Sequence, residues 1–227
     1  MIPIRDDQPT FSTPFVNYFL IIANVAIYLW QASLQFQSPR AADALIHEFG
    51  VEPHRTIAIL TGHSHAGIEA AILPLFTSIF LHGSLFHVAG NMLFLWIFGD
   101  NVEDYLGHFN YLVFYFICGI AGGLTHILLN LNSSMPTIGA SGAIAGVMGA
   151  YFILYPKARV LTWFFVFILW LPAWLVLGYW FALQFLMTSQ YANSGVAVWA
   201  HLGGFAVGVL LVKLFPERQH RQRYGTW

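Results

Sequence analysis

The stretch "TIGASGAIAGVMGAY", residues 137–151, consists almost entirely of small and apolar residues. Such a composition is typical of a helix that lies in a membrane and packs closely against a neighbouring helix. It nevertheless contains a hydroxyl group, on Ser141, between Gly139 and Gly142. That serine is either a small residue that lets two helices approach each other or the nucleophile of an enzyme.

The composition of the whole chain indicates a membrane protein. Hydrophobic residues make up 58% of the 227 residues and charged residues only 8%, and the mean hydropathy is +0.65. Soluble domains carry roughly 25% charged residues, so this chain has too little charge to cover a water-facing surface. The net charge of −1 gives no indication of a nucleic-acid partner. The single cysteine, Cys118, can form no internal disulfide and is expected to be a small core residue.

A helix needs about 20 mostly apolar residues to cross the hydrocarbon layer. We predict an all-α fold, a bundle of six transmembrane helices within residues 14–215, between a short N-terminal tail (1–13) and a basic C-terminal tail (216–227). The N-terminal tail has no basic region ahead of the first apolar stretch, so we do not expect a cleaved signal peptide. The six segments are approximately 14–35, 83–100, 109–130, 138–155, 160–187 and 198–215.

The basic residues predict the orientation of the bundle. Seven of the nine Lys and Arg residues lie in or beside the two tails, or between segments 138–155 and 160–187. Because Lys and Arg favour cytoplasmic flanks, both termini are expected in the cytoplasm. The first loop, residues 36–82, is too long for a simple connector. Its short apolar stretches predict helices that lie in the membrane interface or partly in the outer leaflet.

Four polar residues lie near the extracytoplasmic ends of three different segments. These are His87 and Asn91 in segment 83–100, Ser141 in 138–155 and His201 in 198–215. His87 and Asn91 are four residues apart and share one helix face. Polar residues inside a span are costly and are candidates for function. Their common depth predicts one site, and His82 is a weaker candidate that would support it.

Small residues predict how the two helices that carry Ser141 and His201 meet. Gly204 and Gly208 have the GxxxG spacing that lets helix backbones approach closely, and we expect Gly139 and Gly142 to contribute to the same packing. Such packing would bring the His201 ring to Ser141, and a serine needs a base to become a good nucleophile.

No carboxylate lies at this depth, so we favour a Ser–His dyad over a triad. His87, Asn91 and the backbone N–H of Ser141 would stabilise an oxyanion. Taken singly, each of these residues could equally be a packing or interfacial residue. The chain has no HExxH motif, and His63 and His65 lack an obvious third ligand, so neither a metal nor another cofactor is expected.

Three motifs together resemble the rhomboid family of intramembrane serine proteases, over roughly residues 75–212. They are "FLHGSLFHVAGNMLFLWIFGDNVEDYLGH", "GASGAIAGVMGAY" and "AHLGGFAVGVL". The resemblance implies that Ser141 is the nucleophile and His201 the general base, with His87 and Asn91 at the oxyanion. It also implies substrates with a single transmembrane segment, no cofactor, and a lateral gate and cap formed by segment 160–187 and the following loop, 188–198.

Two departures from the family pattern affect the site. The first loop contains no tryptophan and therefore lacks the Trp-Arg pair of many members. Position 145 is alanine, where some members carry a tyrosine against which the histidine ring stacks, so another aromatic residue is expected beside His201.

Other functions stay open at this point: a catalytically silent relative that binds membrane proteins, or a small transporter or channel. The expected location is the bacterial inner membrane, with the site open to the extracytoplasmic side and the lipid bilayer as surroundings. The sequence makes no prediction of the oligomeric state.

Overall fold

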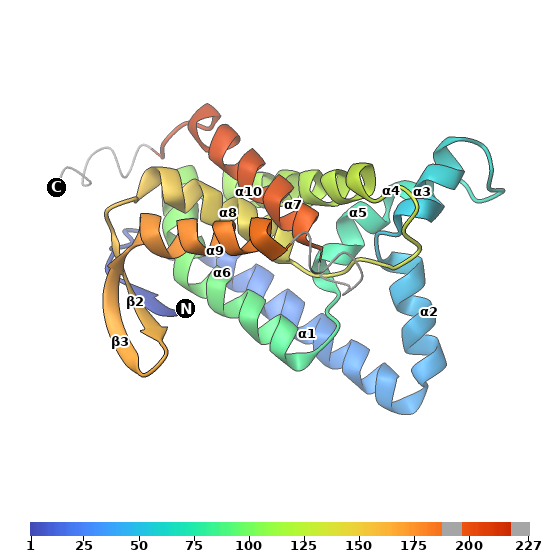
Figure 1. Ribbon diagram of the computed structural model, residues 1–227, viewed down its shortest axis with the longest axis horizontal. Coiled ribbons are helices and arrows are strands. Elements are labelled where there is room, and N and C mark those ends of the chain that lie inside the picture. The colour runs from blue at the N-terminus through green and yellow to red at the C-terminus, as the bar shows by residue number, and fades with distance from the viewer. Residues whose placement is uncertain (188–196, 219–227) are drawn as a thin grey trace.

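The computed structural model describes residues 1–187 and 197–218. Six helices lie side by side, and the first loop projects from one end of the bundle while the N-terminus lies at the other (Figure 1). The predicted mostly helical membrane fold is confirmed, and each predicted segment overlaps one of these helices. They are α1 (Phe15–Gln37), α6 (Leu85–Leu106), α7 (His108–Leu129), α8 (Ser141–Leu154), α9 (Ala173–Met187) and α10 (Val198–Leu211).

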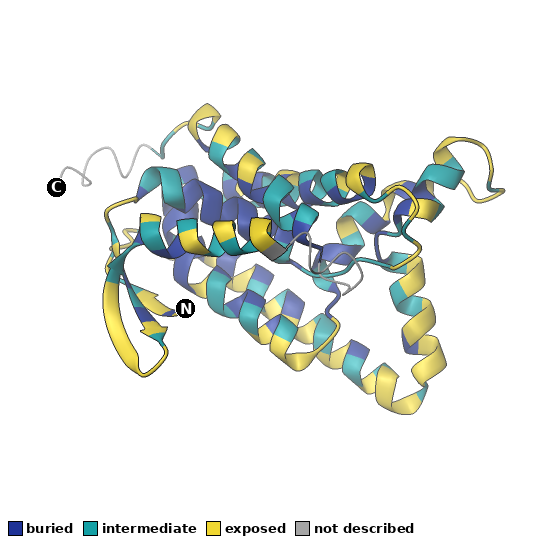
Figure 2. Cartoon of the chain, in the orientation of Figure 1, coloured by how far each residue is buried: buried dark blue, intermediate teal, exposed yellow. Residues whose placement is uncertain are grey.

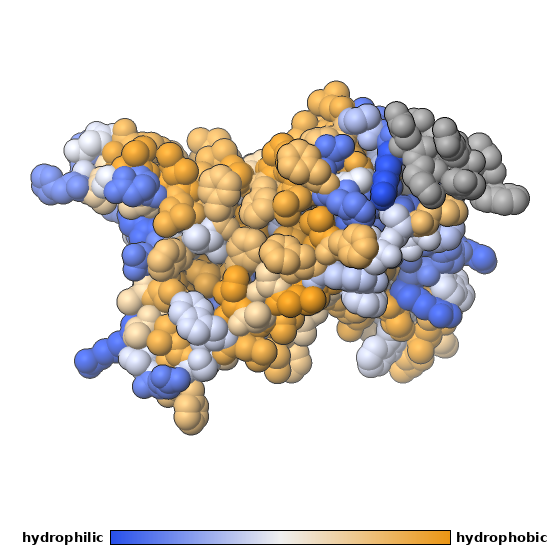
Figure 3. All heavy atoms as spheres, turned by 180° about the vertical axis from the view of Figure 1, so that it is seen from behind, coloured by the Kyte–Doolittle hydropathy of each residue, from blue (hydrophilic) through white to orange (hydrophobic). Residues whose placement is uncertain are grey.

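By length and composition, not all six helices of the described residues qualify as full membrane spans. Two do, α1 and α7. The segments Glu69–Phe80 and Leu85–Leu106 form a third candidate, bent by 79° at the break between them. The shorter apolar helices are Ser141–Leu154, Ala173–Leu186 and Val198–Leu214. A broad apolar band covers the middle of the rear face, with hydrophilic residues gathered at its two ends (Figure 3).

The most buried helix is α8, which carries the opening stretch of the sequence and is wrapped by α6, α7 and α10 (Figure 2). Every residue from Gly142 to Tyr151 is buried. Small side chains make this possible, because they let neighbouring helices approach from several sides. The residue that begins this helix is therefore held in a close-packed environment.

Segment 160–187 was predicted to be one helix, and here the prediction is wrong for its first half. Residues 159–172 form a hairpin of β2 (Arg159–Phe164) and β3 (Phe167–Pro172), and β1 (Ile2–Asp6) adds to it as a third antiparallel strand. The run "RVLTWFFVFILWLP" is rich in β-branched and aromatic residues, which favour strands. A continuous apolar run does not by itself distinguish a strand from a buried helix.

The stretch "FGDNVEDYLGH" was predicted to break the chain after residue 100, but α6 continues to Leu106. The reason is that two of its acidic residues, Glu103 and Asp104, are buried and hydrogen-bonded. Glu103 accepts hydrogen bonds from the backbone N–H groups of Val16 (3.0 Å) and Asn17 (2.7 Å). These N–H groups belong to the first turn of α1, which has no intrahelical acceptor for them. A carboxylate at the end of α6 thus caps the start of α1.

The first loop folds into short helices that end beside the segment preceding Ser141. They are α2 (Pro39–Phe49), α3 (Pro53–Leu60), α4 (Glu69–Ile72), α5 (Pro74–Thr77) and a 3-10 turn, η1 (Ser78–Phe80). A second 3-10 turn, η2 (Val212–Leu214), follows α10. Whether the first loop enters the membrane stays a prediction.

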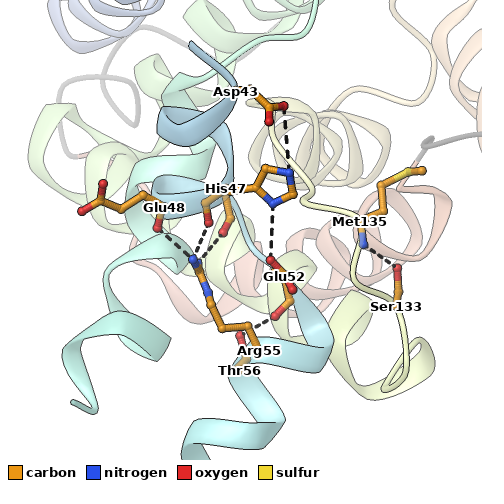
Figure 4. Close-up of polar contacts among 9 residues, drawn as sticks. Asp43, His47, Glu48, Glu52, Arg55, Thr56, Ser133 and Met135 are labelled. Carbon is orange, nitrogen blue, oxygen red and sulfur yellow. Dashed lines mark hydrogen bonds and ion pairs between the residues drawn. The ribbon is translucent and has the colours of Figure 1, made fainter. Parts of the chain in front are cut away.

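The corner between α2 and α3 is held by Arg55 (Figure 4). Its guanidinium donates to the carbonyls of His47, Glu48 (3.1 Å) and Gly50 (3.2 Å) at the end of α2. The His47 ring lies 3.6 Å from a carboxylate oxygen of Glu52. In this chain, an arginine that binds backbone carbonyls therefore braces the loop without a tryptophan partner.

Candidate active site

Ser141 and His201 lie in hydrogen-bonding contact. Ser141 is the first residue of α8, and its Oγ is 2.7 Å from Nε2 of His201 on α10. Both side chains are half-buried. Because Ser141 begins its helix, the N–H groups of the first turn have no intrahelical acceptor, and the positive end of the helix dipole is directed at this point.

The contact between α8 and α10 depends on glycine. A Cβ added to Gly204 would lie 2.0 Å from the carbonyl oxygen of Gly142, and one added to Gly208 would lie 2.0 Å from that of Gly146. No real side chain tolerates such distances, so the two backbones touch where Cβ atoms are missing. The close approach places the first turn of α10, with His201, beside the first turn of α8.

Gly139 has another role than the helix packing expected for it. It lies in the loop before α8 with φ of 130°, a conformation that side chains disfavour. A Cβ there would lie 2.8 Å from two ring atoms of His87. Its N–H donates to the carbonyl of Ser78 (2.8 Å), so the first loop holds the segment that leads into Ser141. The pairing of Val51 with Thr137 adds a second tie.

The other face of the His201 ring is supported by α9. Nδ1 of His201 lies 2.9 Å from Oε1 of Gln184. An amide oxygen only accepts hydrogen bonds, so Nδ1 carries the proton and Nε2 is left to accept the hydrogen of Ser141 Oγ. The Trp180 ring lies 5.8 Å from the His201 ring, tilted by 40°. Trp180 and Gln184 are one turn apart, so a single face of α9 contacts the histidine.

These two residues were not predicted individually. The expectation of another aromatic residue near His201, needed because position 145 is alanine, is met by Trp180. Gln184 was missed, although a signal existed: it is the one amide side chain in the apolar run "VLGYWFALQFLM". Polar residues in such a run are candidates for function, and this criterion would have found it.

His87 and Asn91 line the same cavity as Ser141 and His201. This cavity, of about 410 Å³, lies among α6, α8, α9 and α10. Apolar residues, Phe86, Phe94, Ile144 and Met148 among them, form much of its wall, and Gly90 leaves open space. The cavity therefore combines an apolar lining with four polar groups that converge near the Ser141 hydroxyl, as ligand sites usually do.

His82 stands behind Asn91 rather than in the cavity. Its Nε2 lies 2.9 Å from Nδ2 of Asn91, while its backbone N–H and carbonyl are both bonded to the Gln31 side chain (3.1 and 2.9 Å). The Asn91 amide has a second N–H that stays available. His82 thus orients Asn91, which matches its predicted supporting position.

Comparisons with known proteins agree with this architecture. A family model described as "Rhomboid domain" matches residues 69–218. Rhomboid protein 1, mitochondrial, from Saccharomyces cerevisiae is 34% identical over 167 residues, which cover 66% of this chain and 45% of that protein. RHOMBOID-like protein 1 from Arabidopsis thaliana is 34% identical over 151 residues, with 63% and 34% covered. Presenilin-associated rhomboid-like protein, mitochondrial, from Rattus norvegicus is 32% identical over 124 residues, with 53% and 33% covered.

The matched region spans less than half the length of each of these relatives. All three come from eukaryotes, and two have mitochondrial names, so they give no support to the expected bacterial inner membrane. The span candidates and the family together identify an integral membrane protein. Since the rhomboid domain covers well over half of its residues, this chain belongs to the rhomboid family.

Proposed function

We propose that this protein is an intramembrane serine endopeptidase that hydrolyses peptide bonds in or next to the transmembrane segments of other membrane proteins. The observation that carries the proposal is the 2.7 Å contact between Ser141 Oγ and His201 Nε2 at the wall of an apolar cavity. Membership of the rhomboid family supports the same class of reaction.

In the first step, Nε2 of His201 takes the proton of Ser141 while Oγ attacks the carbonyl carbon of the substrate. The resulting oxyanion would be stabilised by the side chains of His87 and Asn91 and by the N–H of Ser141, each such donor contributing about 3–4 kcal/mol in measured cases. Protonated His201 then gives its proton to the departing amine, leaving an acyl ester on Ser141. Water, deprotonated by His201, attacks the ester and releases the second product.

Gln184 is proposed as a positioning residue. By accepting a hydrogen bond from Nδ1–H it fixes the tautomer and the direction of the His201 ring. Its neutral amide stabilises an imidazolium less than a carboxylate would, so the arrangement is a dyad with an orienting partner.

The proposed substrate is a protein with a single transmembrane segment, cut near the end of that segment where α8 begins. The cavity is bordered by α6 on one side and α9 on the other, so we propose that the substrate reaches it between these two helices. Loop 188–196, expected to form most of a cap, lies outside the described residues. In this proposal both chain termini are cytoplasmic and the site opens to the opposite side.

The test is cleavage of a single-span substrate by the protein reconstituted in lipid vesicles. Ser141→Ala should abolish cleavage, while Ser33→Ala, a serine on the exposed face of α1, should leave it unchanged. A fluorophosphonate should label Ser141, with the modified peptide identified by mass spectrometry. Undiminished cleavage by the Ser141→Ala variant would overturn the proposal.

A further inference from the structure

We propose that the β2–β3 hairpin is a lipid-binding element, with its tip inserted among the acyl chains of the leaflet on the side of the N-terminus. The inference concerns residues that do not line the cavity of Ser141 and His201, and it does not depend on the proposed reaction.

The tip of the hairpin is strongly apolar and exposed. Phe165 and Val166 are 80% and 84% exposed, and the next two residues, Phe167 and Ile168, are 61% and 60% exposed. The outer part of the hairpin is the yellow region beside the N-terminus in Figure 2. Contiguous apolar surface of this kind marks a site of contact with a membrane or a partner.

The base of the hairpin, in contrast, is fixed to the protein. Val160 and Thr162 on β2 are fully buried. Arg159 donates to the Asp7 carboxylate through its backbone N–H (2.7 Å) and its Nε (3.0 Å). In Figure 1, β2 and β3 run across the direction of α8 and α9 at the end of the bundle that carries the N-terminus. A firmly held base with a projecting tip directs the apolar residues away from the bundle, along the expected plane of the membrane surface.

The residues around the tip are those found at membrane interfaces. Cross-strand pairing places Trp163 opposite Ile168, and Leu161 opposite Trp170, on the face turned away from Val160 and Thr162. The Arg5 guanidinium lies 5.5 Å from the centre of the Trp170 ring. Tryptophan and arginine are enriched at the level of lipid head groups, where the ring is partly dehydrated and the cation meets phosphate.

A lipid chain also fits the space between the hairpin and α9. A cavity of about 420 Å³ is lined there by Met1, Ile2, Trp163, Phe164, Phe165 and Tyr179. It joins the hairpin to the outer face of α9, where Trp174 is 51% exposed. That face meets acyl chains in any helix bundle within a membrane, so the lipid surface continues from α9 onto the hairpin.

The place of the hairpin in the chain indicates its depth. The hairpin lies directly between α8 and α9, where one helix of the membrane bundle has ended and the next begins. The strands therefore begin near the edge of the hydrocarbon layer. Deep insertion is excluded because the open edge of β3 carries backbone groups that need water or another partner. The consistent position is shallow, with the tip among the upper parts of the acyl chains.

The experiment uses a spin label at Val166→Cys and, as control, at Lys157→Cys, in the full chain reconstituted in vesicles of phosphatidylcholine and phosphatidylglycerol. Lys157 is exposed in the turn just before β2, and the native Cys118 is fully buried. Oxygen concentrates in the hydrocarbon layer, and a charged nickel chelate stays in water. The Val166 label should collide several times more often with oxygen than with the chelate, and the Lys157 label should show the reverse.

The inference is overturned if the Val166 label is as accessible to the chelate as the Lys157 label. It is also overturned if the spectra of Val166 labels stay broadened by spin–spin contact however far the protein is diluted with lipid. Such broadening would mean that a second copy of the chain, and not lipid, covers the tip. The label sits at a highly exposed position, and an unchanged melting temperature would verify that the fold is intact. Failure of the proposed proteolysis would not affect either outcome.

Discussion

Two clusters of polar side chains lie at opposite ends of the same helices, and they are built differently. At the start of α6 and α8, His87, Asn91 and Ser141 face a cavity of about 410 Å³. At the end of α6, Glu103 is fully buried and bonded to the N–H groups of Val16 and Asn17 and to the His108 ring. The cluster beside the cavity, called the outer cluster after the side on which the proposed function places it, has space for another molecule next to its polar groups. In the cluster at the end of α6, called the inner cluster, the acceptors are bonded within the protein itself.

The difference gives a criterion for distinguishing a proposed catalytic cluster from a structural one inside a membrane protein. Burying a polar group costs free energy unless its hydrogen bonds are replaced. At the inner end these bonds are made within the chain, where Asp104 likewise accepts from Ser12 (2.6 Å) and from the Phe11 N–H (3.2 Å). At the outer end the polar groups line a cavity instead.

The largest expected effect is on activity, at the outer cluster. His201→Ala removes the base and should lower kcat/KM by at least about 10³-fold, while the melting temperature changes little. The matched control is His63→Ala, on the exposed surface of the first loop, which should cleave like the wild type. Cleavage kinetics in lipid vesicles give kcat/KM for both variants. Activity of His201→Ala within about tenfold of the wild type would contradict its role as the base.

The next effect should be on stability, at the inner cluster. Glu103→Gln removes a buried charge that accepts three hydrogen bonds, so the free energy of unfolding should fall by about 2–4 kcal/mol. Glu48→Gln, on the exposed face of α2, should change it by no more than about 0.5 kcal/mol. Denaturant unfolding in detergent measures the free energy of unfolding of both variants. Equal free energies of unfolding for the two variants would contradict the structural role of Glu103.

A third variant tests how the helices hold the outer cluster together. Gly204→Ala places a Cβ 2.0 Å from the Gly142 carbonyl oxygen, and relieving this clash should cost about 1–3 kcal/mol and slow cleavage. Gly178→Ala is the matched control, because a Cβ there meets no atom within 4 Å. It should be neutral, or stabilising by about 0.5–1 kcal/mol. Similar melting temperatures for the two variants would show that α8 and α10 need no glycine contact.

Gln184→Leu should have a smaller effect on the reaction. Losing one neutral hydrogen bond, worth roughly 1 kcal/mol, should reduce kcat several-fold, up to about tenfold, and leave KM nearly unchanged. Gln184→Glu keeps an acceptor for Nδ1 and should restore the rate, with a changed pH profile. If both variants cleave at the wild-type rate, Gln184 has no positioning role.

The smallest effect should be a dependence on pH at the inner end. Burial raises the pKa of Asp6 from 3.8 to about 6, and the Tyr151 hydroxyl donates to this carboxylate. A raised folded-state pKa means that the protonated form is favoured, so stability should fall as the pH rises from about 4 to about 6. Asp6→Asn should lose less stability over this range. The measurement is the melting temperature of both proteins as a function of pH. Equal changes between pH of about 4 and about 6 would contradict the raised pKa of Asp6.

Much of the outer cluster could be predicted from the sequence because depth in a membrane follows from helix ends. The start of each apolar segment and the distribution of Lys and Arg residues predict the depth of His87, Ser141 and His201 in the membrane. The GxxxG spacing further indicated where α8 and α10 would touch, which Gly204 and Gly208 do.

The contributions of α9 and the inner end were harder to predict. Gln184 could have been singled out as a polar residue in an apolar run, but its contact with His201 depends on the tertiary position of α9, which no local pattern encodes. Between Val160 and Leu171 the only polar residue is Thr162, so neither helical nor strand periodicity was visible in the sequence. Pairing with β1 favours the hairpin. Glu103 and Asp104 looked like loop residues because their partners lie about 90 positions away in the chain.

The most direct test of the contrast between the two clusters is the initial rate of substrate cleavage per folded molecule, measured for Ser141→Ala and Glu103→Gln in the same vesicles. The Ser141→Ala variant should be folded and show no cleavage above background. The Glu103→Gln variant should yield less folded protein, and each folded molecule should cleave at nearly the wild-type rate. Wild-type cleavage by Ser141→Ala, or complete inactivity of folded Glu103→Gln, would contradict the division into an active and a structural cluster.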